Sequence, residues 1–177
     1  IYVPHNQTES MTLCDRIVSM KDGFIQQVGT PQQVFDHPAN LFVAGFIGTP
    51  QMNFFDGTLV KHDGRYFIET DGLSVELSED KQQRLAAKDV AEQQVTVGVR
   101  PEHVIIGQSG IPAKVDVSEM MGSSVHLHMS ALGGDMIAIV PLNGEAAHYP
   151  MGMDVKLSFG GHVVHVFSKD DSKNLEW

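Results

Sequence analysis

The sequence predicts a mainly β protein in which a barrel-like region follows a small α/β piece. Two observations carry this prediction. From Phe54 onward, short strand patterns recur about every eight to twelve residues with Gly and Asp turns between them, which favours a barrel or sandwich over a parallel sheet. Before that point strands alternate with short helical patterns, and the composition changes at residues 49–53. We therefore expect one unit over residues 1–50 and a β domain over residues 51–177.

The first unit carries clear start and stop signals. Asp22-Gly23 is a hairpin turn pair. Thr30 is a good N-cap, Pro31 suits the first helical position, and Pro38 sets the end of that helix. In chain order, the expected elements are a strand end at 1–3, a short helix from a cap at Asn6 to about residue 15, hairpin strands at 16–20 and 24–28, and helices at 31–37 and 40–46.

The β domain is expected to contain about ten strands. That number exceeds one five-stranded barrel, so two fused lobes, or one barrel with a strand-rich extension, would fit. The glycine pairs at 133–134 and 160–161 are interpreted as hairpin turns, because no helix follows either pair. The expected strands are 55–60, 66–69, 73–77, 95–99, 104–106, 113–119, 125–132, 136–142, 155–159 and 163–167, with one surface helix at 79–88.

Charge and composition exclude several classes of function. The formal net charge of −10 argues against direct binding to a nucleic-acid backbone or an anionic membrane. Cys14 is the single cysteine, so no internal disulfide and no cysteine-based zinc site can form. The longest apolar run, residues 41–47, is far too short to span a membrane, and no targeting segment is visible.

Several segments resemble the ATP-binding subunits of ABC transporters. Residues 2–13, with the run Val3-Pro4-His5-Asn6-Gln7, are similar to the switch-histidine segment, whose usual form is Val-Thr-His-Asp-Gln-x-Glu-Ala. The similarity continues at 15–23, 25–31, 36–40 and 43–48. Residues 50–54 resemble the junction that leads, in the sugar-importer branch, to an OB-like regulatory region called TOBE. Residues 97–103 resemble that region's signature. The resemblance implies an OB-like (TOBE) barrel preceded by a remnant of an ABC nucleotide-binding domain.

His5 is the candidate catalytic residue. Spacing alone would allow a histidine in a capped turn after a strand. The resemblance instead implies a switch histidine, which bonds a γ-phosphate oxygen and holds the attacking water by positioning and electrostatics. Pro4 stands where the family usually has Thr and removes a backbone donor. Asn6 stands where Asp is usual and lacks its negative charge.

The motifs that bind nucleotide are absent from this sequence. It contains no phosphate loop, no acidic magnesium-binding strand and no Ser-Gly-Gly-Gln-type signature. We therefore expect the chain alone neither to bind ATP tightly nor to hydrolyse it, and expect no cofactor in it, whereas ATP and Mg²⁺ would serve the full-length parent.

The resemblance also implies partners and a location. The parent would energise an importer for sugars or related solutes, as a homodimer with a second copy of the subunit, on integral membrane permease subunits at the cytoplasmic face of the membrane. The β domain would mediate dimerisation and receive a regulatory protein; no nucleic acid is expected. The alternative is a free-standing OB-like module that binds an oxyanion, a sugar or a partner protein.

Arg100, Pro101, Glu102 and His103 are the interface or regulatory candidates within the β domain. Arg100 and Glu102 could form a salt bridge, or contact the nucleotide domain. Alternatively, Arg100 could tie down the turn of its own barrel.

Two further clusters have competing interpretations. His126 and His128 share a strand face, and with His162 and His165 on the last hairpin they could bind a metal. The competing interpretation places the first two on a solvent-facing side. The methionines beside glycines could form an adaptable contact surface, although core or loop packing is the expected role. They are Met120, Met121, Met151 and Met153.

Overall fold

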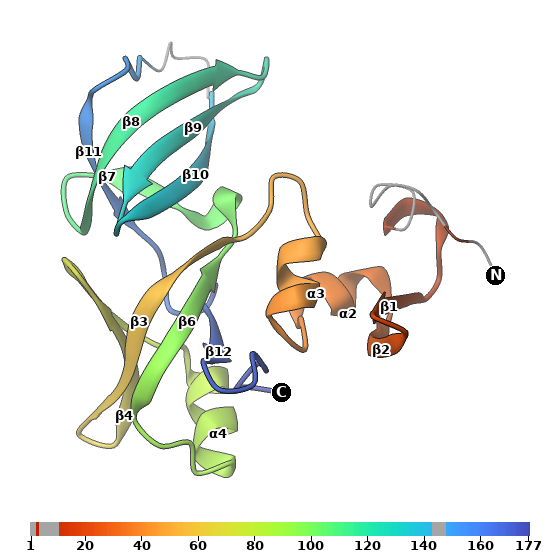
Figure 1. Cartoon of the computed structure of the whole chain (residues 1–177). Coiled ribbons are helices and arrows are strands. Elements are labelled where there is room, and N and C mark those ends of the chain that lie inside the picture. The colour runs from red at the N-terminus through yellow and green to blue at the C-terminus, as the bar shows by residue number, and fades with distance from the viewer. Residues whose placement is uncertain (1–2, 4–10, 143–147) are drawn as a thin grey trace.

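The computed structural model describes residues 3, 11–142 and 148–177. Three antiparallel sheets are arranged in three parts (Figure 1). A two-stranded hairpin with two short helices forms the N-terminal unit, residues 17–47. Two five-stranded sheets form the rest. We call them the lower sheet, with strand order β12-β6-β3-β4-β5, and the upper sheet, with order β10-β9-β8-β11-β7, from their places in Figure 1.

The N-terminal unit closely follows its sequence signals. The hairpin turn places Asp22 and Gly23 at φ 50° and 82°, which is the geometry that an Asp-Gly pair favours. Thr30 and Gln33 form a reciprocal capping box at the start of the first helix. Asn40 caps the second helix by accepting from Val43 N. The elements are β1 (Ile17–Lys21), β2 (Phe24–Gly29), α2 (Pro31–Asp36) and α3 (Leu41–Phe46).

The lower sheet is discontinuous in sequence. Its first four strands are consecutive, but its edge strand β12 arrives only after the chain has built the upper sheet. It contains β3 (Asn53–His62), β4 (Arg65–Thr70), β5 (Leu73–Glu76), β6 (Gln93–Val99) and β12 (His165–Ser168), with α4 (Glu79–Ala87) between β5 and β6. The chain leaves this sheet through the 3-10 turn η1 (Pro101–His103).

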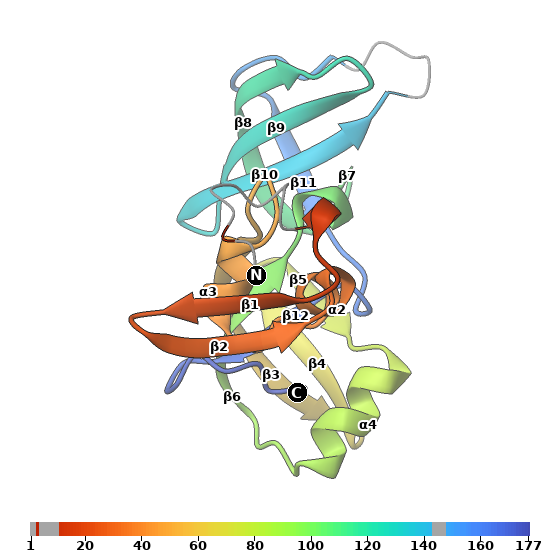
Figure 2. The same cartoon turned by 90° about the vertical axis from the view of Figure 1, so that its right-hand side faces the viewer.

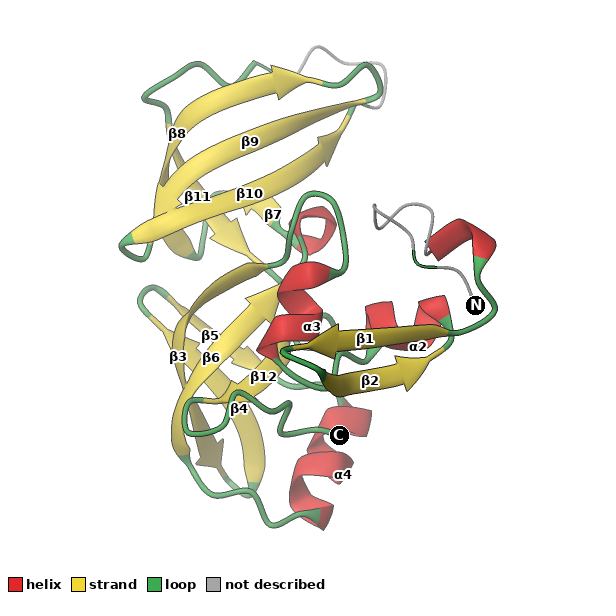
Figure 3. Ribbon diagram, turned by 45° about the vertical axis from the view of Figure 1, so that its right-hand side comes forward, coloured by secondary structure: helices red, strands yellow, loops and turns green. Residues whose placement is uncertain are grey.

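The upper sheet is built by the middle of the β region (Figure 3). Leu132 and Gly133, at φ 53° and 74°, make the tight turn of the hairpin between its strands β9 and β10, which confirms the expected turn at residues 133–134. Its strands are β7 (Ile105–Gly107), β8 (Ile111–Met120), β9 (Ser124–Ala131), β10 (Gly134–Pro141) and β11 (Asp154–Ser158).

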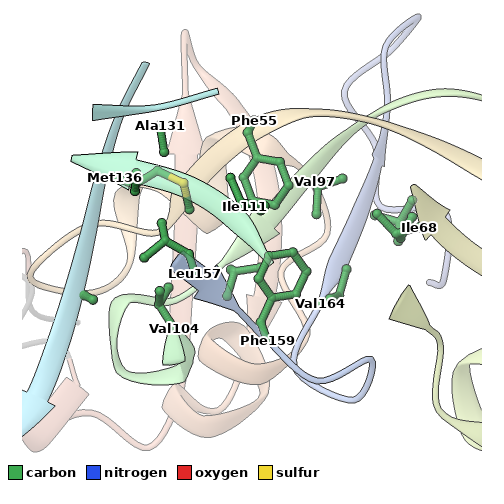
Figure 4. Packing of buried hydrophobic residues seen from close by; sticks show 14 of the residues in the cluster. Phe55, Ile68, Val97, Val104, Ile111, Ala131, Met136, Leu157, Phe159 and Val164 are labelled. Atoms are coloured by element: carbon green, nitrogen blue, oxygen red, sulfur yellow. The ribbon is translucent and has the colours of Figure 1, made fainter. Parts of the chain in front are cut away.

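One hydrophobic core joins the two five-stranded sheets. Phe55 and Val97 of the lower sheet belong to the same buried cluster as Ile111, Met136 and Leu157 of the upper sheet (Figure 4). A continuous core of this kind resists relative movement of the sheets, because separating them would expose close-packed apolar surface. The mainly β fold with OB-like character is therefore confirmed as two sheets on one core.

The N-terminal unit has a small core of its own and a separate contact with the lower sheet. Ile17, Val34, Val43 and Ile47 form its buried centre. Ala44 of α3 belongs instead to a cluster with Met52 and Phe167, which packs α3 against the lower sheet. Figure 2 shows the β1–β2 hairpin on the side of this unit away from the lower sheet.

One expected turn is wrong, and the expected surface helix forms with one buried face. Residues 160–161 are not a hairpin turn, because β11 and β12 lie in different sheets and this segment carries the chain between them. The helix at 79–88 is not merely a surface helix. Gln82 is buried and its amide pairs with both backbone groups of Tyr66, at 2.7 and 2.8 Å.

The expectation that the methionines fill the core is wrong. Met120, Met121 and Met151 are exposed, and Met153 is more than one-third exposed, so none of the four fills the core. They lie at the end of β8, in the turn that follows it and in the segment before β11.

Candidate functional site at the junction of the N-terminal unit and the lower sheet

Arg100 lies where the N-terminal unit meets the lower sheet. It follows the last residue of β6, and its side chain is only 2% exposed. Nη1 donates to the carbonyl of Ile47 at 2.9 Å, and Nη2 donates to the carbonyl of Phe35 at 2.6 Å. The guanidinium also stacks on the ring of Phe35, 3.6 Å from its centroid. One side chain therefore satisfies the carbonyl ends of both α2 and α3, which lack partners within their helices.

Gly48 provides the room for this guanidinium. Its φ of +113° suits glycine, and a Cβ there would come within 2.8 Å of Arg100 Nη1. A larger residue would displace the charged group from the two carbonyls. The close approach of the backbone to the guanidinium therefore requires a glycine at this position.

Burial changes the acidity of the guanidinium without removing its charge. Loss of solvent lowers the pKa of Arg100 well below its usual value, to about 10, and the nearby carboxylates of Glu102 and Asp36 partly oppose this effect. The group remains protonated at neutral pH, so both hydrogen bonds are charge-assisted at all physiological pH values.

The other three members of the Arg-Pro-Glu-His run have different environments. Pro101 is buried in the first turn of η1, whereas Glu102 and His103 are exposed. Among the described residues no ion pair joins Arg100 to Glu102, which influences it only through charge. Of the alternatives raised by the sequence, the structure shows contact with the preceding unit at Phe35 and Ile47.

His165 is a buried histidine that sequence reasoning considered only as a metal ligand. It is 8% exposed, lies on β12, and its Nδ1 has no hydrogen-bond partner among the described residues. Burial lowers its pKa from 6.5 to about 3, with further contributions from the positive charges of Lys81 and Arg100. His165 is therefore neutral at physiological pH.

The four histidines considered as a metal site are not brought together. His126 and His128 lie on the outer face of β9, and they alternate along the strand with buried residues of the inner face. His128 also pairs with Glu119, at 3.2 Å. His165 lies in the other five-stranded sheet. In residues 3, 11–142 and 148–177, no group of three or more His, Cys, Asp or Glu side chains is arranged to hold a metal ion.

An open cleft of about 630 Å³ lies between the lower sheet and the β9–β10 turn. Its polar lining includes Asp56, Glu69 and Asp71, with Thr58 and Gln94 beside them. Asp56 is paired with Lys169 at 2.6 Å and Glu69 with His62 at 2.8 Å. An acidic lining of this kind repels an oxyanion, because no basic group among the lining residues would compensate its charge.

His5, with the neighbouring Pro4 and Asn6, lies outside the described residues. Of the helix expected after it, residues 11–15 are described; residues 11–13 are helical, whereas residues 14–15 are not, so the helix ends earlier than expected. Its role as a switch histidine therefore stays a prediction from the sequence. No helix in the described part of the chain is both long and apolar enough to cross a membrane.

Comparisons with known proteins identify two domain types in the β region. Residues 48–104 match the MalK OB fold domain, and residues 97–167 match the TOBE domain. The matches overlap at residues 97–104, where β6, Arg100 and η1 lie. The Arg-Pro-Glu-His run is thus shared by both domain types.

The chain is also similar over most of its length to ABC transporter ATP-binding proteins. It is 43% identical over 172 residues to the uncharacterized ABC transporter ATP-binding protein YurJ of Bacillus subtilis, which covers 93% of this chain and 46% of that protein. It is 43% identical over 178 residues to the oligosaccharides import ATP-binding protein MsmX of the same organism, covering 96% of this chain and 47% of MsmX. The chain spans about half the length of these relatives.

A solved structure shows a weaker likeness. The cytoplasmic molybdate-binding protein ModG is 15% identical with a TM-score of 0.48, covering 63% of this chain and 92% of that chain. At that TM-score the likeness carries no argument about ligand or function.

Proposed function

We propose, for a chain that carries the MalK-like OB and TOBE domains of ABC transporter ATP-binding proteins, that it is the C-terminal part of the energising subunit of an oligosaccharide importer. The observation that carries this proposal is the 43% identity with an oligosaccharide import protein over 96% of the chain, because that alignment includes the N-terminal unit as well as both β domains. Residues 1–50 would end the nucleotide domain, and residues 51–177 would form the regulatory domain.

In the parent protein, His5 would orient the water that attacks the γ-phosphate. ATP and Mg²⁺ would be held by residues outside this chain, because the phosphate loop and the acidic metal-binding strand are not in its sequence. ATP binding would favour the closed arrangement of two copies, and hydrolysis would reset it. The subunit would work at the cytoplasmic face of the membrane, attached to permease subunits.

The surface of the β1–β2 hairpin supports the proposal that more protein covers it. Val18, Met20, Phe24, Ile25 and Val28 are all exposed on two strands whose outer edges carry no further strand among the described residues. Apolar side chains gathered on an open sheet are typical of an interface. The rest of a nucleotide domain would supply that cover.

The β domain would serve dimerisation and regulation. Its exposed methionines offer flexible apolar surface at the end of β8 and in the turn after it, and in the segment before β11; they are Met120, Met121, Met151 and Met153. Unbranched thioether side chains adapt to different partners, so such a surface suits a second copy or a regulatory protein. Arg100 would couple this domain to the nucleotide domain through the carbonyls of Phe35 and Ile47.

The importer proposal is tested in the intact parent protein. We expect a strain lacking its gene to lose uptake of at least one oligosaccharide, and expect the wild-type gene to restore it. The gene for His5→Ala should restore the amount of the protein in that strain but not the uptake of the oligosaccharide. The ATPase rate of this variant should be lower than that of the wild type by about 10²-fold or more. Retained uptake with His5→Ala would contradict the assigned role of His5, and upstream residues without a phosphate loop would contradict the transporter assignment.

The 177-residue chain tests the other two parts of the proposal. It should show no ATPase activity, because it lacks the phosphate-binding motifs. Light scattering should show dimers at high micromolar concentration, and Met120→Ser with Met121→Ser should weaken them. A strictly monomeric chain at that concentration would count against a bridging role for the β domain.

A second candidate function is a ligand-binding module, and the open cleft favours it. Carboxylate, hydroxyl and amide groups such as those of Asp71, Thr58 and Gln94 form hydrogen bonds with the hydroxyls of a sugar. Calorimetric titration with oligosaccharides and with molybdate separates the ligand classes. Binding heat with a sugar, lost in the variant Asp71→Ala, would support a sugar site. Binding heat with molybdate alone would contradict the expectation that the acidic lining of the cleft repels an oxyanion.

A further inference from the structure

We infer that residues 172–177 act as a strap that fastens the N-terminal unit to the lower sheet, and that the buried ion pair between Lys81 and Glu176 holds the strap closed. The strap lies between the α2–α3 connection and strand β12, and its end reaches α4 (Figure 1). It is the last described segment of the chain, 95 residues from Lys81, so nothing in the local sequence pattern requires it to be there.

Backbone hydrogen bonds hold the strap on both sides. Toward the N-terminal unit, Leu41 N donates to Ser172 O and Asn174 N donates to Ala39 O, both at 2.9 Å. Toward the lower sheet, Ser168 N donates to Lys173 O at 2.8 Å and Leu175 N donates to Val166 O at 2.9 Å. The strap therefore pairs with the outer edge of β12 and with the α2–α3 connection at once.

Asn174 adds a side-chain connection. It is buried, its Nδ2 donates to Pro38 O at 2.9 Å, and its Oδ1 accepts from Glu176 N at 3.0 Å. Pro38 has no backbone donor and sits where α2 has ended, so its carbonyl needs a partner from elsewhere. Asn174 meets that need and simultaneously sets the direction of the residues that follow it.

Glu176 fixes the end of the strap to α4. Both carboxylate oxygens accept from Lys81 Nζ, at 2.9 and 2.8 Å, and the residues are only 2% and 5% exposed. Burial raises the pKa of Glu176, and the positive charge of Lys81 counters this effect. Each charge is thus buried only because the other is present, so removal of one leaves the other without a partner.

Trp177 adds a contact between α2 and α4. Its ring lies 4.2 Å from the ring of His37, the C-cap of α2, and the guanidinium of Arg84 stacks on it at 3.7 Å. Lys88 Nζ donates to its carbonyl. The tryptophan therefore contacts the end of α2 and α4 together.

The arrangement gives the strap a mechanical role. The N-terminal unit has its own core, separate from the core shared by the two five-stranded sheets, so the two bodies need an added connection to move together. Arg100 supplies one connection and the strap supplies another, on neighbouring surfaces of the same unit. With the strap closed, the unit and the lower sheet form one body; with it open, Arg100 and the small cluster around Ala44 remain.

Hydrogen exchange of backbone amides in the intact chain tests this inference. In Lys81→Met, we expect the amides of Leu41, Asn174 and Leu175 to exchange about tenfold faster or more, while the amide of Leu127 in the upper sheet changes less than about twofold. Asn174→Ala, which leaves α4 untouched, should accelerate the same three amides. The double variant Lys81→Met with Glu176→Leu should return them close to wild-type rates, since no buried charge is then unpaired.

The matched control is Lys114→Met, which removes an exposed ion pair with Asp154 of 2.7 Å. It should leave all of these rates unchanged. Wild-type rates at Leu41 in both Lys81→Met and Asn174→Ala would overturn the inference. Equal acceleration at Leu41 and Leu127 would also overturn it, because the pair would then stabilise the whole fold and would not hold a separable strap.

Discussion

The amide side chain of Asn53 makes both of its hydrogen bonds to one residue, Ile137. Nδ2 donates to Ile137 O at 2.8 Å, and Oδ1 accepts from Ile137 N at 2.7 Å. Asn53 begins β3 in the lower sheet, and Ile137 lies on β10, the edge strand of the upper sheet. A single buried amide thereby acts as a strand partner for an edge that would otherwise be open, and joins the two sheets through residues that are 84 positions apart in sequence.

We expect Asn53→Ala to lower the free energy of unfolding by about 2–3 kcal/mol. The variant leaves a buried N–H and C=O of Ile137 without partners, and such losses are more costly than the net value of the bonds themselves. Chemical denaturation followed by fluorescence measures the change, and Gln51→Ala, an exposed neighbour, is the control. Equal stability of the two variants would mean that water or a strand shift replaces the amide.

Replacement of Arg100 should remove one of the two connections that hold the N-terminal unit to the lower sheet, and so distinguish it from the strap. Arg100→Lys keeps the charge, but a lysine cannot reach both carbonyls or stack on Phe35. We therefore expect the free energy of unfolding to fall by about 2–4 kcal/mol. Arg65→Lys, at an exposed arginine paired with Glu76 and Glu79, should change the free energy of unfolding far less, because water screens that site. A similar small effect at both sites would show that Arg100 does not carry the junction.

Local signals predicted much of the fold because their chemistry involves neighbouring residues. The Asp22-Gly23 turn and the Thr30 cap depend on atoms within three residues, and both form as expected. The pairings of Lys81 with Glu176 and of Asn53 with Ile137 depend on residues 95 and 84 positions away, for which one sequence gives no signal. The Arg-Pro-Glu-His run was identified by resemblance alone, and only the structure shows what Arg100 contacts.

The error at residues 160–161 has a specific physical origin. A glycine pair between two strand patterns normally indicates a hairpin, but here glycine serves close backbone approach. A Cβ at Gly161 would overlap the carbonyl of Glu76, so this segment packs directly against the end of β5. The sequence pattern is the same in both cases, because both need a residue without a side chain.

Gly161→Ala tests that explanation. We expect the free energy of unfolding to fall by about 2–4 kcal/mol, because the added methyl group must displace a backbone carbonyl and no rotamer change can make room for it. Gly107→Ala is the matched control, because a Cβ there meets nothing within 4 Å. Thermal unfolding of both variants under one condition gives the comparison, and tolerance of alanine at 161 would argue for a hairpin-like loop that can move.

The buried neutral His165 predicts a specific dependence of stability on pH. Its pKa is about 3 in the folded chain, lowered chiefly by burial, against about 6.5 when unfolded. Between these values the unfolded chain binds a proton that the folded chain does not, so the stability from His165 is complete above pH 6.5 and is lost as the pH falls toward 3. The maximum loss is about 5 kcal/mol. The variant His165→Leu should lose less stability than the wild type between pH 7 and pH 4, as measured by urea denaturation at each pH. The control is His148→Leu, at an exposed histidine, whose stability should follow the wild-type profile. Parallel profiles for wild type and His165→Leu would mean that the folded chain opens to let this histidine take up its proton.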